Sequence, residues 1–557
     1  MTTSTPPLPA PLSGSGEAFP KLTPAQLARV AKLGRVRKIA AGDILLESSE
    51  QAPRFFFVIE GAIEVVKLTD AGEQLIAALR TGQFTGELNM LSGRRAFVRV
   101  RATESGEVVE FDRDRGLDLV QTDNDVGEIV MRAFILRRSQ LVARGLGDAV
   151  LVGSTHCSGT LRIREFLTRN DHPHIFLDLD RDAGAQEVLD RFHVDIAKIP
   201  VLICRGTEIL HNPSNQQVAD CLGFNDAIER THVRDLVVVG AGPAGLAAAV
   251  YGASEGLDVL VLESTAPGGQ AGSSSKIENY LGFPEGISGQ QLGERAHNQA
   301  QKFGAQVMIA RDAVGLSCQR RPYAIKIGDG TQVPARTVVI ATGAQYRRLA
   351  LPNLAHFEGA GVYYGATPME SQVCRGEEVV VVGGGNSAGQ AAVFLAQTAR
   401  HVHVLVRSRG LAETMSRYLV RRIEETPNIE LKTLCKIVAL EGADDLESVT
   451  WKDSDGKVTT APIRHVFMMT GANPNTGWLQ NCVALDEKGF VKAGQDLRPS
   501  DLEASKWPLS RPPLLFETNR PGVFAVGDVR AGSVKRVAAA VGEGSVCIQL
   551  VHKVLAE

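Results

Sequence analysis

Three glycines at a fixed spacing could hold a phosphate group. Gly240, Gly242 and Gly245, with Pro243 and Ala244 between the last two, follow an apolar run and precede an alanine-rich stretch. The first glycine allows a tight turn, the second lets the backbone approach a pyrophosphate, and the third lets a helix pack closely on a strand. The N–H groups at the start of that helix then face the phosphates. The spacing therefore predicts a dinucleotide-binding turn.

An acidic residue and two apolar runs complete this pattern. The runs 236–239 and 259–262 are rich in valine and leucine, as expected for parallel strands buried on both faces. Glu263 ends the second run, where a carboxylate can accept hydrogen bonds from a ribose 2′-OH and disfavours a 2′-phosphate. The strands and the helix between them are the elements that must position the turn and the acid. Their order predicts a parallel strand–helix–strand unit.

A second glycine-rich turn lies further along the chain. The apolar run 379–382 precedes the residues predicted to hold a second dinucleotide, which are Gly383, Gly385, Asn386, Ser387 and Ala388. The next strand-like run, 403–406, is followed by Arg407 and Arg409, and no acid stands there. Guanidinium groups suit a 2′-phosphate. The second site is therefore predicted to bind NADPH rather than NADH.

Length and charge restrict the remaining possibilities. At 557 residues the chain is too long for one core, which predicts three or four domains. The 60 basic and 63 acidic residues give a net charge of -3, so there is no electrostatic case for binding nucleic acid or an anionic membrane. No uninterrupted apolar run reaches the length that spans a bilayer. Residues 1–22 do not have the pattern of a signal peptide and predict a disordered tail.

The cysteines are scattered. They stand at Cys157, Cys204, Cys221, Cys318, Cys374, Cys435, Cys482 and Cys547, with no CxxC motif. This spacing excludes a contiguous dithiol and a zinc site made of paired CxxC motifs, and we expect no metal site. Isolated thiols suit a reducing compartment, so we expect a cytoplasmic protein.

The segment 23–147 has short strand-like runs punctuated by glycines. After a predicted helix at 23–33, the runs 39–45, 55–61 and 82–88 resemble the cyclic-nucleotide-binding domain family, which implies a β-roll followed by a helix. In that family a Gly-Glu pair contacts the ribose, and an arginine nine residues later grips the cyclic phosphate.

The ligand-binding residues of that family are only partly present. Counting from Glu87, the arginine position holds Ala96, and Arg95 could serve only if the loop shifted by one residue. An arginine fork can bind two phosphate oxygens, whereas alanine offers none. We expect a β-roll that has lost cyclic-nucleotide affinity, and the alternative is retained binding through Arg95.

The segment 148–226 resembles the thioredoxin/glutaredoxin fold. The resemblance rests on the predicted order of strand 149–154, helix 158–168, strand 174–179, helix 183–192, strand 200–204 and helix 214–222. It places Pro200 at the family's cis-proline and Cys157 at its nucleophile, while Thr160 replaces the resolving cysteine. Because a helix N-terminus lowers a thiol pKa, Cys157 could be a reactive monothiol. The alternative is a connector with only a structural role.

The rest of the chain, 233–557, resembles the low-molecular-weight thioredoxin reductases. The resemblance implies an FAD domain in two parts, 227–350 and 478–557, an NADPH domain at 351–477, and a homodimer. Besides the first glycine turn and Glu263, the implied FAD residues are Gly269, Gln270, Asn279, Thr342, Gly343, Gly527, Asp528, Arg536, Val537 and Ala538. The whole chain is thus predicted to be a multidomain α/β protein, in which a β-roll and a thioredoxin-like domain precede two Rossmann-like domains.

One departure from that family bears on the chemistry. The reductases carry a CxxC in the NADPH domain, and here Gly365 and Pro368 stand at its cysteine positions. Cys374 is close by but unpaired, and we expect it to be a small apolar filler. The face of the flavin would then be left to an acceptor or blocked by Tyr363 and Tyr364.

Three functions remain open at this point. The first is an NADPH-dependent flavin oxidoreductase that passes electrons directly to an unidentified acceptor, either a small molecule or a redox protein. The second is a thiol–disulfide reductase that uses Cys157 or a partner's cysteine. The third is a sensory or scaffold protein that reports the redox state of the flavin.

Overall fold

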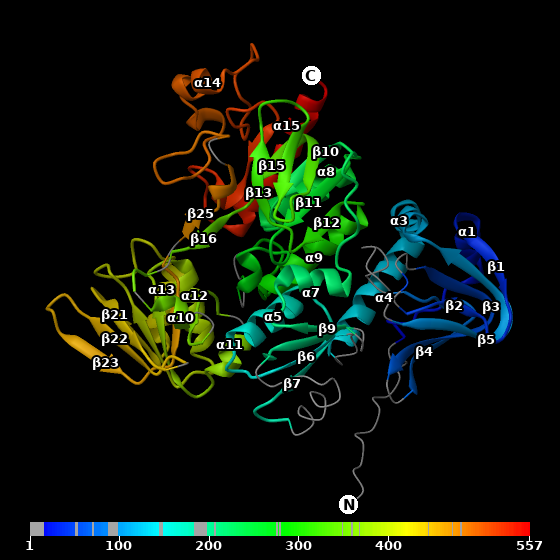
Figure 1. The fold of residues 1–557 in the computed structure, drawn as a ribbon, viewed down its shortest axis with the longest axis horizontal. Helices are drawn as coiled ribbons and strands as arrows, with labels where there is room; N and C mark the ends of the chain where they lie inside the picture. Colours follow the sequence, from blue (N-terminus) through cyan, green and yellow to red (C-terminus); the bar gives the residue numbers. More distant parts are fainter. Residues whose placement is uncertain are drawn as a thin grey trace, which may run out of the picture.

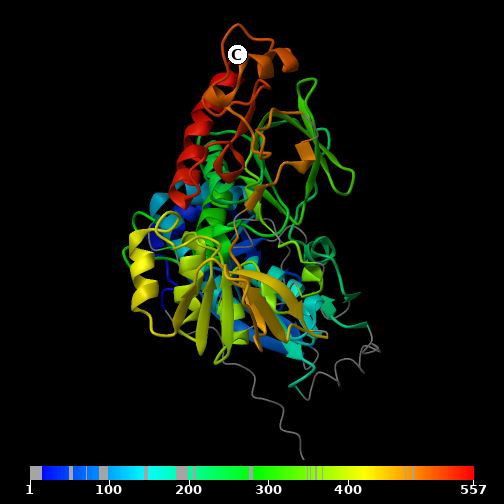
Figure 2. The same cartoon turned by 90° about the vertical axis from the view of Figure 1, so that its left-hand side faces the viewer.

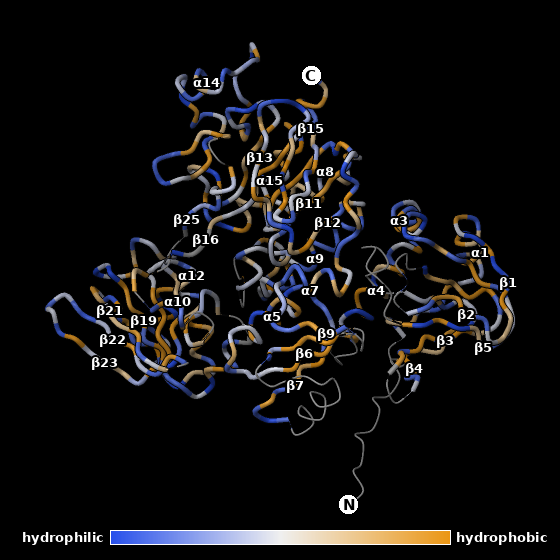
Figure 3. Tube along the Cα trace, viewed as in Figure 1, coloured by the Kyte–Doolittle hydropathy of each residue, from blue (hydrophilic) through white to orange (hydrophobic). Residues whose placement is uncertain are grey.

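The computed structural model describes residues 16–557, apart from 49, 51–53, 70–71, 87–97, 144–148, 183–197, 205–207, 275–276, 278–279, 348, 352, 358–359, 367, 444, 471 and 480–481. The described chain is a mixed α/β protein built on several separate sheets (Figure 1). Apolar residues are concentrated along the strands of these sheets (Figure 3). The predicted fold class is confirmed. No helix among the described residues is long and apolar enough to cross a membrane.

The N-terminal unit is an antiparallel β-roll. Its elements are α1 (Pro24–Leu33), β1 (Arg35–Ile39), β2 (Ile44–Leu46), β3 (Phe55–Thr69), β4 (Gly72–Arg80) and β5 (Arg99–Phe111). Thr23 caps α1 by accepting a hydrogen bond from the backbone N–H of Gln26. The interior holds a cluster of aromatic rings with centroids 5.0 to 6.2 Å apart, from Phe55, Phe57, Phe84, Phe111 and Phe134. Helices α3 (Arg113–Thr122) and α4 (Asn124–Ala143) then connect the β-roll to the rest of the molecule (Figure 1).

The predicted disordered tail is wrong for its last residues. Ala18 and Leu22 are buried, and the carbonyl of Ala18 accepts a 2.7 Å hydrogen bond from Nε of Arg137 on α4. The Phe19 ring lies 4.5 Å from the Arg137 guanidinium. The prediction relied on the polar, proline-rich average composition of 1–22, and it overlooked the few apolar side chains that pack against the β-roll. Residues 1–15 lie outside the described residues.

A central module, defined as residues 149–224, follows. Its elements are β6 (Ala149–Gly153), α5 (Ser158–Arg169), β7 (His174–Asp178), β8 (Val201–Cys204), β9 (Glu208–His211) and α7 (Asn215–Leu222). The strand order is β7-β6-β8-β9, with β6 parallel to β7 and antiparallel to β8. The bond between Ile199 and Pro200 is cis, as the resemblance predicted. The hairpin strand β9 was not predicted, and the predicted helix 183–192 lies outside the described residues.

The next unit is a seven-stranded sheet with helices on its faces. Its strands are β12 (Gln306–Ile309), β11 (Val259–Glu263), β10 (Arg234–Val239), β15 (Gln332–Ile340), β14 (Tyr323–Ile327) and β13 (Ala313–Ser317) in spatial order, and β26 (Val523–Ala525) pairs with β15. Its helices are α8 (Pro243–Ser254), α9 (Gly289–Lys302) and α15 (Val537–Leu555), and α14 (Pro499–Ser505) lies outside the sheet. Because β26 comes from the end of the chain, this unit is assembled from two distant segments.

A second parallel sheet is inserted between those segments. Its order is β17 (Val362–Tyr363), β24 (His465–Met468), β18 (Glu378–Val382), β19 (His401–Leu405) and β20 (Ile429–Lys432). The helices of this unit are α10 (Leu354–Phe357), α11 (Pro368–Val373), α12 (Asn386–Leu395) and α13 (Arg417–Glu425). A three-stranded antiparallel sheet covers it, made of β21 (Lys436–Glu441), β22 (Ser448–Lys452) and β23 (Val458–Ala461) (Figure 2). The two crossings between the units pair as the ribbon β16 (Ala344–Tyr346) and β25 (Ala472–Pro474).

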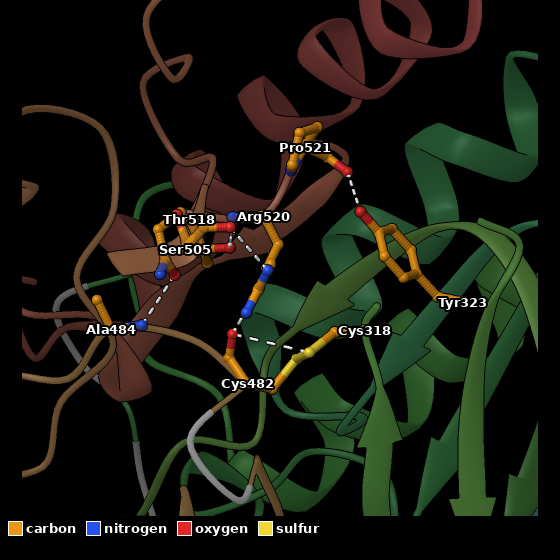
Figure 4. The surroundings of a disulfide bond; sticks show 9 residues. Cys318, Tyr323, Cys482, Ala484, Ser505, Thr518, Arg520 and Pro521 are labelled. Carbon is orange, nitrogen blue, oxygen red and sulfur yellow. Dashed lines mark hydrogen bonds between the residues drawn. A yellow bond between two sulfur atoms is a disulfide. The ribbon is translucent and has the colours of Figure 1, made fainter. Parts of the chain in front are cut away.

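The structure pairs four of the eight cysteines, which corrects the expectation of isolated thiols. Cys204 is bonded to Cys221, and Cys318 is bonded to Cys482 (Figure 4). The partners are 17 and 164 positions apart in the sequence. The absence of a CxxC motif did not exclude these pairs, because the fold brings together residues that are distant in sequence. Near the second pair, Arg520 donates a 2.9 Å hydrogen bond to the carbonyl of Cys482 (Figure 4).

Charged side chains from three units meet at one junction. Arg138 of α4 is 2% exposed, and its Nε donates a 3.2 Å hydrogen bond to Oδ2 of Asp171, which follows α5. Glu294 on α9 interacts with both residues. Burial, together with the nearby Asp171 carboxylate, raises the pKa of Glu294 to about 7, and Arg138 and Arg295 oppose that rise.

Replacing Glu294 by glutamine should stabilise the protein above pH 7 and have little effect below about pH 4.5. The folded pKa of about 7 exceeds the ordinary value of 4.5, so the folded state holds this proton more tightly than the unfolded state does. The penalty for the buried carboxylate therefore develops as the pH rises between these values, to a limit of about 3 kcal/mol. Thermal unfolding of Glu294→Gln from pH 4 to 8 measures this effect, with the exposed Glu285→Gln as the control. A stability difference that is constant over this range would contradict the prediction.

Candidate functional site

The first glycine turn has the geometry that its sequence predicts. Gly240 has a φ of +105°, and a Cβ there would lie 2.4 Å from the carbonyl oxygen of Ala341. A Cβ at Gly245 would lie 1.8 Å from the carbonyl oxygen of Gly240, so only glycine allows α8 to approach the turn this closely. At Gly242, by contrast, the nearest atom to an added Cβ is 3.9 Å away. Packing thus requires glycine at 240 and 245, whereas Gly242 leaves open space at the N-terminus of α8.

Glu263 connects the first turn to the loop that follows β11. This side chain is buried, and its Oε2 accepts a 2.7 Å hydrogen bond from the N–H of Ala241. Its Oε1 accepts hydrogen bonds from the N–H groups of Thr265 (2.8 Å) and Ala266 (3.2 Å). The carboxylate therefore fixes two backbone segments, and its contact with a ribose stays a prediction from the sequence.

The predicted Gly-Gly-Gln segment lies directly against the first turn. A Cβ at Gly269 would lie 2.9 Å from Cα of Gly242, and the N–H of Gly268 donates to the carbonyl of Ala241. Nε2 of Gln270 donates to the carbonyl of Ala344. Thr342 and Gly343 follow β15 beside the same turn, and Oγ1 of Thr342 donates a 2.8 Å hydrogen bond to Asn475 O. Asn279 lies outside the described residues.

The Gly527-Asp528 pair lies against the first turn of α8. A Cβ at Gly527 would lie 2.8 Å from that of Ala244, and the N–H of Gly527 donates a 2.7 Å hydrogen bond to Oε2 of Glu543. Arg530 pairs with the same Glu543 at 2.6 Å. Burial raises the pKa of the half-buried Asp528. Sequence reasoning missed Glu543 and Arg530, and their only sequence signal is a charged pair that stands close to the Gly-Asp motif.

Helix α15 begins beside this pair. Arg536 is its N-cap residue, and Val537 and Ala538 form its first turn. A Cβ at Gly544 would lie 2.2 Å from the carbonyl oxygen of Ala244, so α15 and α8 are in close backbone contact. The structure thus brings together the predicted residues of the first turn, the Gly-Gly-Gln segment, the end of β15 and the start of α15.

The second glycine turn repeats the geometry of the first. Gly383 has a φ of +143°, and a Cβ there would lie 2.1 Å from Met469 O. Gly385 caps α12, and an added Cβ would meet no atom within 4 Å. Ala388 is buried in the helix–sheet contact, whereas Asn386 and Ser387 are exposed.

The segment after β19 closes over this second turn. A Cβ at Gly384 would lie 3.8 Å from Oγ of Ser408, and the exposed Arg407 and Arg409 flank that serine. Oγ1 of Thr414 donates a 2.6 Å hydrogen bond to Gly384 O, and the N–H of Ser416 donates to Oδ1 of Asn386. The sequence analysis missed both contacts, although the polar run before α13 is typical of a helix start. The two arginines are therefore close to the second turn, and their contact with a 2′-phosphate stays a prediction.

Two protein families match parts of this chain. The family described as pyridine nucleotide-disulphide oxidoreductase matches residues 234–544, which hold both glycine turns. The chain belongs to this oxidoreductase family. The family described as cyclic nucleotide-binding domain matches residues 36–123, within the β-roll.

Thioredoxin reductases are among the similar proteins. The enzyme of Chlamydia trachomatis is 32% identical over 325 residues, which cover 56% of this chain and 96% of that protein. NADPH-dependent thioredoxin reductase 3 of Arabidopsis thaliana is 30% identical over 326 residues, and the match spans only 57% of that longer protein. The crystal structure of Lactococcus lactis thioredoxin reductase has a TM-score of 0.52 and 28% identity, and covers 58% of this chain and 99% of its own. The structure of the T. acidophilum enzyme has the same TM-score at 27% identity, and covers 59% and 100%.

These matches confirm the predicted resemblance for the two glycine turns and for the β-roll. The oxidoreductase is thus an enzyme with thioredoxin reductase relatives, and the predicted cofactors FAD and NADPH agree with this family. The described residues fit two dinucleotides, because open space at Gly242 and at Gly385 faces a helix N-terminus in each case.

Gly365, one of the two positions where the resemblance implies a replaced cysteine, lies at a contact between the two sheet units. A Cβ at Gly365 would lie 3.3 Å from Cβ of Ser273, in the short 3-10 helix (Ala271–Ser273) that follows the Gly-Gly-Gln segment. Pro368 is the first residue of α11. Gly365 therefore faces the loop 264–273, which follows β11, contains the Gly-Gly-Gln segment and is called the cofactor loop below.

The side chains near this contact have other roles. Cys374 is fully buried among apolar residues, as predicted, and burial raises its pKa to about 12. The ring of Tyr363 packs on Phe467 (5.2 Å) and His465 (6.0 Å) within its own unit. The ring contacts of Tyr363 therefore favour the alternative in which this side chain leaves the face of the flavin open.

Cys157 is at the N-cap of α5 in the central module. Cys157 is partly exposed. A Cβ at Gly159 would lie 3.1 Å from the Pro200 ring, so the cis-proline borders the first turn of this helix. The neighbouring His156 lies 3.8 Å from Oδ2 of Asp445 in the inserted unit. Thr160 is buried. The thiol is thus on a loop that borders the inserted unit.

Glu87, Arg95 and Ala96 all lie outside the described residues. Loss of cyclic-nucleotide affinity therefore stays a prediction from the sequence.

Proposed function

We propose that this chain is an NADPH-dependent flavin oxidoreductase that delivers electrons from the flavin directly to an acceptor other than a thioredoxin disulfide. The observation that carries the proposal is the glycine at the contact with the cofactor loop. Neither Gly365 nor Pro368 can form a disulfide, and the sequence contains no CxxC motif that could replace the missing pair. Cys374 is too buried to act as a substitute.

The residues of the two glycine turns have distinct tasks in this proposal. FAD would be held by the first turn, Glu263, the Gly-Gly-Gln segment and the Gly527-Asp528 pair. NADPH would be held by the second turn, with Arg407 and Arg409 at the 2′-phosphate. The bound flavin supplies the hydride chemistry, and the protein supplies position and electrostatics. The helix N-termini at Gly242 and Gly385 favour the negative charge of each pyrophosphate.

The proposed domain boundaries follow the elements of the fold. The ribbon β16–β25 closes the inserted unit near both of its ends, which supports an NADPH domain at about 351–477 within a divided FAD domain. The order of the four strands supports a thioredoxin-like assignment for the central module. The homodimer remains a prediction from the resemblance.

A second candidate is a thiol–disulfide reductase that works through Cys157. It is favoured by one observation, which is that this partly exposed thiol caps a helix beside a cis-proline and next to the inserted unit. A helix N-terminus favours the thiolate that such chemistry needs. The two candidates differ in whether removing thiols stops the transfer of electrons.

The test is a Cys157→Ser, Cys374→Ser double variant. NADPH consumption is measured with an artificial quinone as acceptor, and thioredoxin disulfide reduction is measured separately. We expect quinone turnover within about twofold of the parent, and thioredoxin reduction near background in both proteins, because no thiol lies on the proposed path. Cys435→Ser, which alters another buried cysteine, is the matched control. Rapid thioredoxin reduction by the parent that the double variant lacks would contradict direct transfer, and absence of NADPH turnover would indicate a sensory or scaffold protein.

A further inference from the structure

The end of helix α5 reaches from the central module into the cofactor loop. Nη2 of Arg169, the last residue of α5, donates a 3.0 Å hydrogen bond to the carbonyl of Gly269. The same nitrogen lies 3.6 Å from where a Cβ at Gly272 would be. Arg169 is 19% exposed, so the contact is largely removed from solvent. One guanidinium thus holds the segment that packs on Gly242 of the first turn.

The next residue holds the same loop closer to Glu263. Asn170 is 5% exposed, and its Nδ2 donates a 3.1 Å hydrogen bond to the carbonyl of Thr265. The N–H of Thr265 is already bonded to the Glu263 carboxylate. In the reverse direction, Nε2 of Gln290 on α9 donates a 3.0 Å hydrogen bond to the carbonyl of Thr168. The loop after β11 is therefore fixed on one side by its own acid and on the other by the central module.

The corner that carries these side chains is fixed from the β-roll. Asp171 has a φ of +51°, and its carboxylate and its carbonyl both accept hydrogen bonds from Arg138 of α4. We define residues 169–171 as the corner. Helix α4, which follows the β-roll, contacts the corner on one side, and the corner contacts the cofactor loop on the other side. Three consecutive residues thus connect α4 to the cofactor loop.

The contacts from the corner matter for the cofactor loop because two consecutive residues of this loop are glycines. Gly268 and Gly269 have φ values of +99° and +54°, and neither has a side chain that could hold this conformation. Glycines lose more conformational freedom on ordering than other residues. Hydrogen bonds to the carbonyls of Thr265 and Gly269 therefore restrict the part of the loop that must be ordered for a dinucleotide to bind.

We propose that Arg169 and Asn170 are positioning residues for the cofactor loop. In this proposal Arg138 and Asp171 couple the β-roll to the same loop. The inference rests on the proposed function only in that residues 263–270 hold the flavin. The central module then stabilises the flavin site, and this role does not depend on the reactivity of Cys157. A change in the position of α4, which follows the β-roll, would then change the affinity for flavin through the corner.

A contact between the same two units provides a matched control. Asp220 on α7 pairs at 2.6 Å with Arg311, which follows β12. Among the described residues, neither side chain of this pair makes a hydrogen bond or an ion pair with the cofactor loop. If the corner only holds the two units together, removing either contact should have the same effect. If the corner positions the loop, only its own variants should weaken flavin binding.

The experiment measures the dissociation constant of FAD for the full-length apoprotein, through the quenching of flavin fluorescence. We expect Arg169→Ala to weaken binding about tenfold, Asn170→Ala about fivefold, and Asp220→Ala less than twofold. Arg169→Lys should recover most of the affinity, because an ammonium can still donate to Gly269 O. Thermal unfolding of each apoprotein shows whether a variant is folded. Equal FAD affinities for Arg169→Ala and Asp220→Ala would overturn the proposal, as would a failure of Arg169→Lys to exceed Arg169→Ala.

The coupling is tested by a double-mutant cycle. Asp171→Asn keeps a residue that tolerates positive φ and removes the charge that faces Arg138. We expect it to weaken FAD binding about threefold alone and to add less than twofold to Arg169→Ala, because both changes act through the corner. Full additivity would overturn the coupling. The acceptor assays with quinone and thioredoxin test the proposed function separately, since FAD affinity does not depend on where the electrons leave.

Discussion

Gly245→Ala should abolish retention of the flavin. The added Cβ would lie 1.8 Å from the carbonyl oxygen of Gly240 and 3.2 Å from Cβ of Ala341, and a backbone oxygen in a tight turn has no room to move. Helix α8 would have to shift away from β10, and overpacking of this kind costs about 3 kcal/mol. Because the turn would lose its shape, we expect FAD affinity to fall at least about 100-fold, which equals about 2.7 kcal/mol.

The same substitution elsewhere gives a control for that variant. Gly542 lies in α15, and a Cβ there would meet no atom within 4 Å. Alanine is favoured over glycine in a helix by about 1 kcal/mol, so Gly542→Ala should unfold at the same or a higher temperature and keep its flavin. Flavin content after gel filtration and thermal unfolding measure both variants. Normal flavin content in Gly245→Ala would contradict the assignment of this turn.

Arg407→Ala should separate the two nicotinamide cofactors. Only NADPH has the 2′-phosphate that this guanidinium is proposed to contact, and a charge-assisted hydrogen bond contributes about 1.5–3 kcal/mol. We expect the KM for NADPH to rise about 20-fold and the KM for NADH to stay within about twofold. Steady-state kinetics with both cofactors and a quinone acceptor measure this difference.

Two other arginines make the result specific. Arg421 is in the same unit and pairs with Glu425 on the exposed face of α13, so Arg421→Ala should change neither KM. Arg409→Ala tests the other guanidinium beside the second turn. An equal rise for NADPH and NADH in Arg407→Ala would refute a phosphate contact, and a rise found only in Arg409→Ala would assign that contact to Arg409.

The turns and strands of the two dinucleotide-type units could be predicted because their signals are local. A run of valines predicts a buried strand, and the demand for glycine at Gly240 and Gly245 comes from atoms that the same short motif supplies. The predicted helix at 23–33 likewise corresponds to α1. These features need no knowledge of the rest of the chain.

The contacts between units could not be predicted for the opposite reason. Arg169 and Gly269 are 100 positions apart, and an arginine at the end of an amphipathic helix is ordinarily expected to face solvent. The pairing of Cys318 with Cys482 likewise depends on the final fold. The buried position of Ala18 was missed because average composition conceals a few apolar residues in a polar segment. Function at the boundary between units is therefore the part that the sequence pattern leaves open.

The glycine at position 365 also has a mechanical consequence. At this point the inserted unit approaches the short helix Ala271–Ser273 with no side chain of its own in between, and even a Cβ would lie only 3.3 Å from Ser273. The size of residue 365 thus limits how closely the two units can approach each other at this contact. A larger side chain would work as a wedge and hold the units apart by its own thickness. Variation at this position would then change the spacing of the two units at this contact.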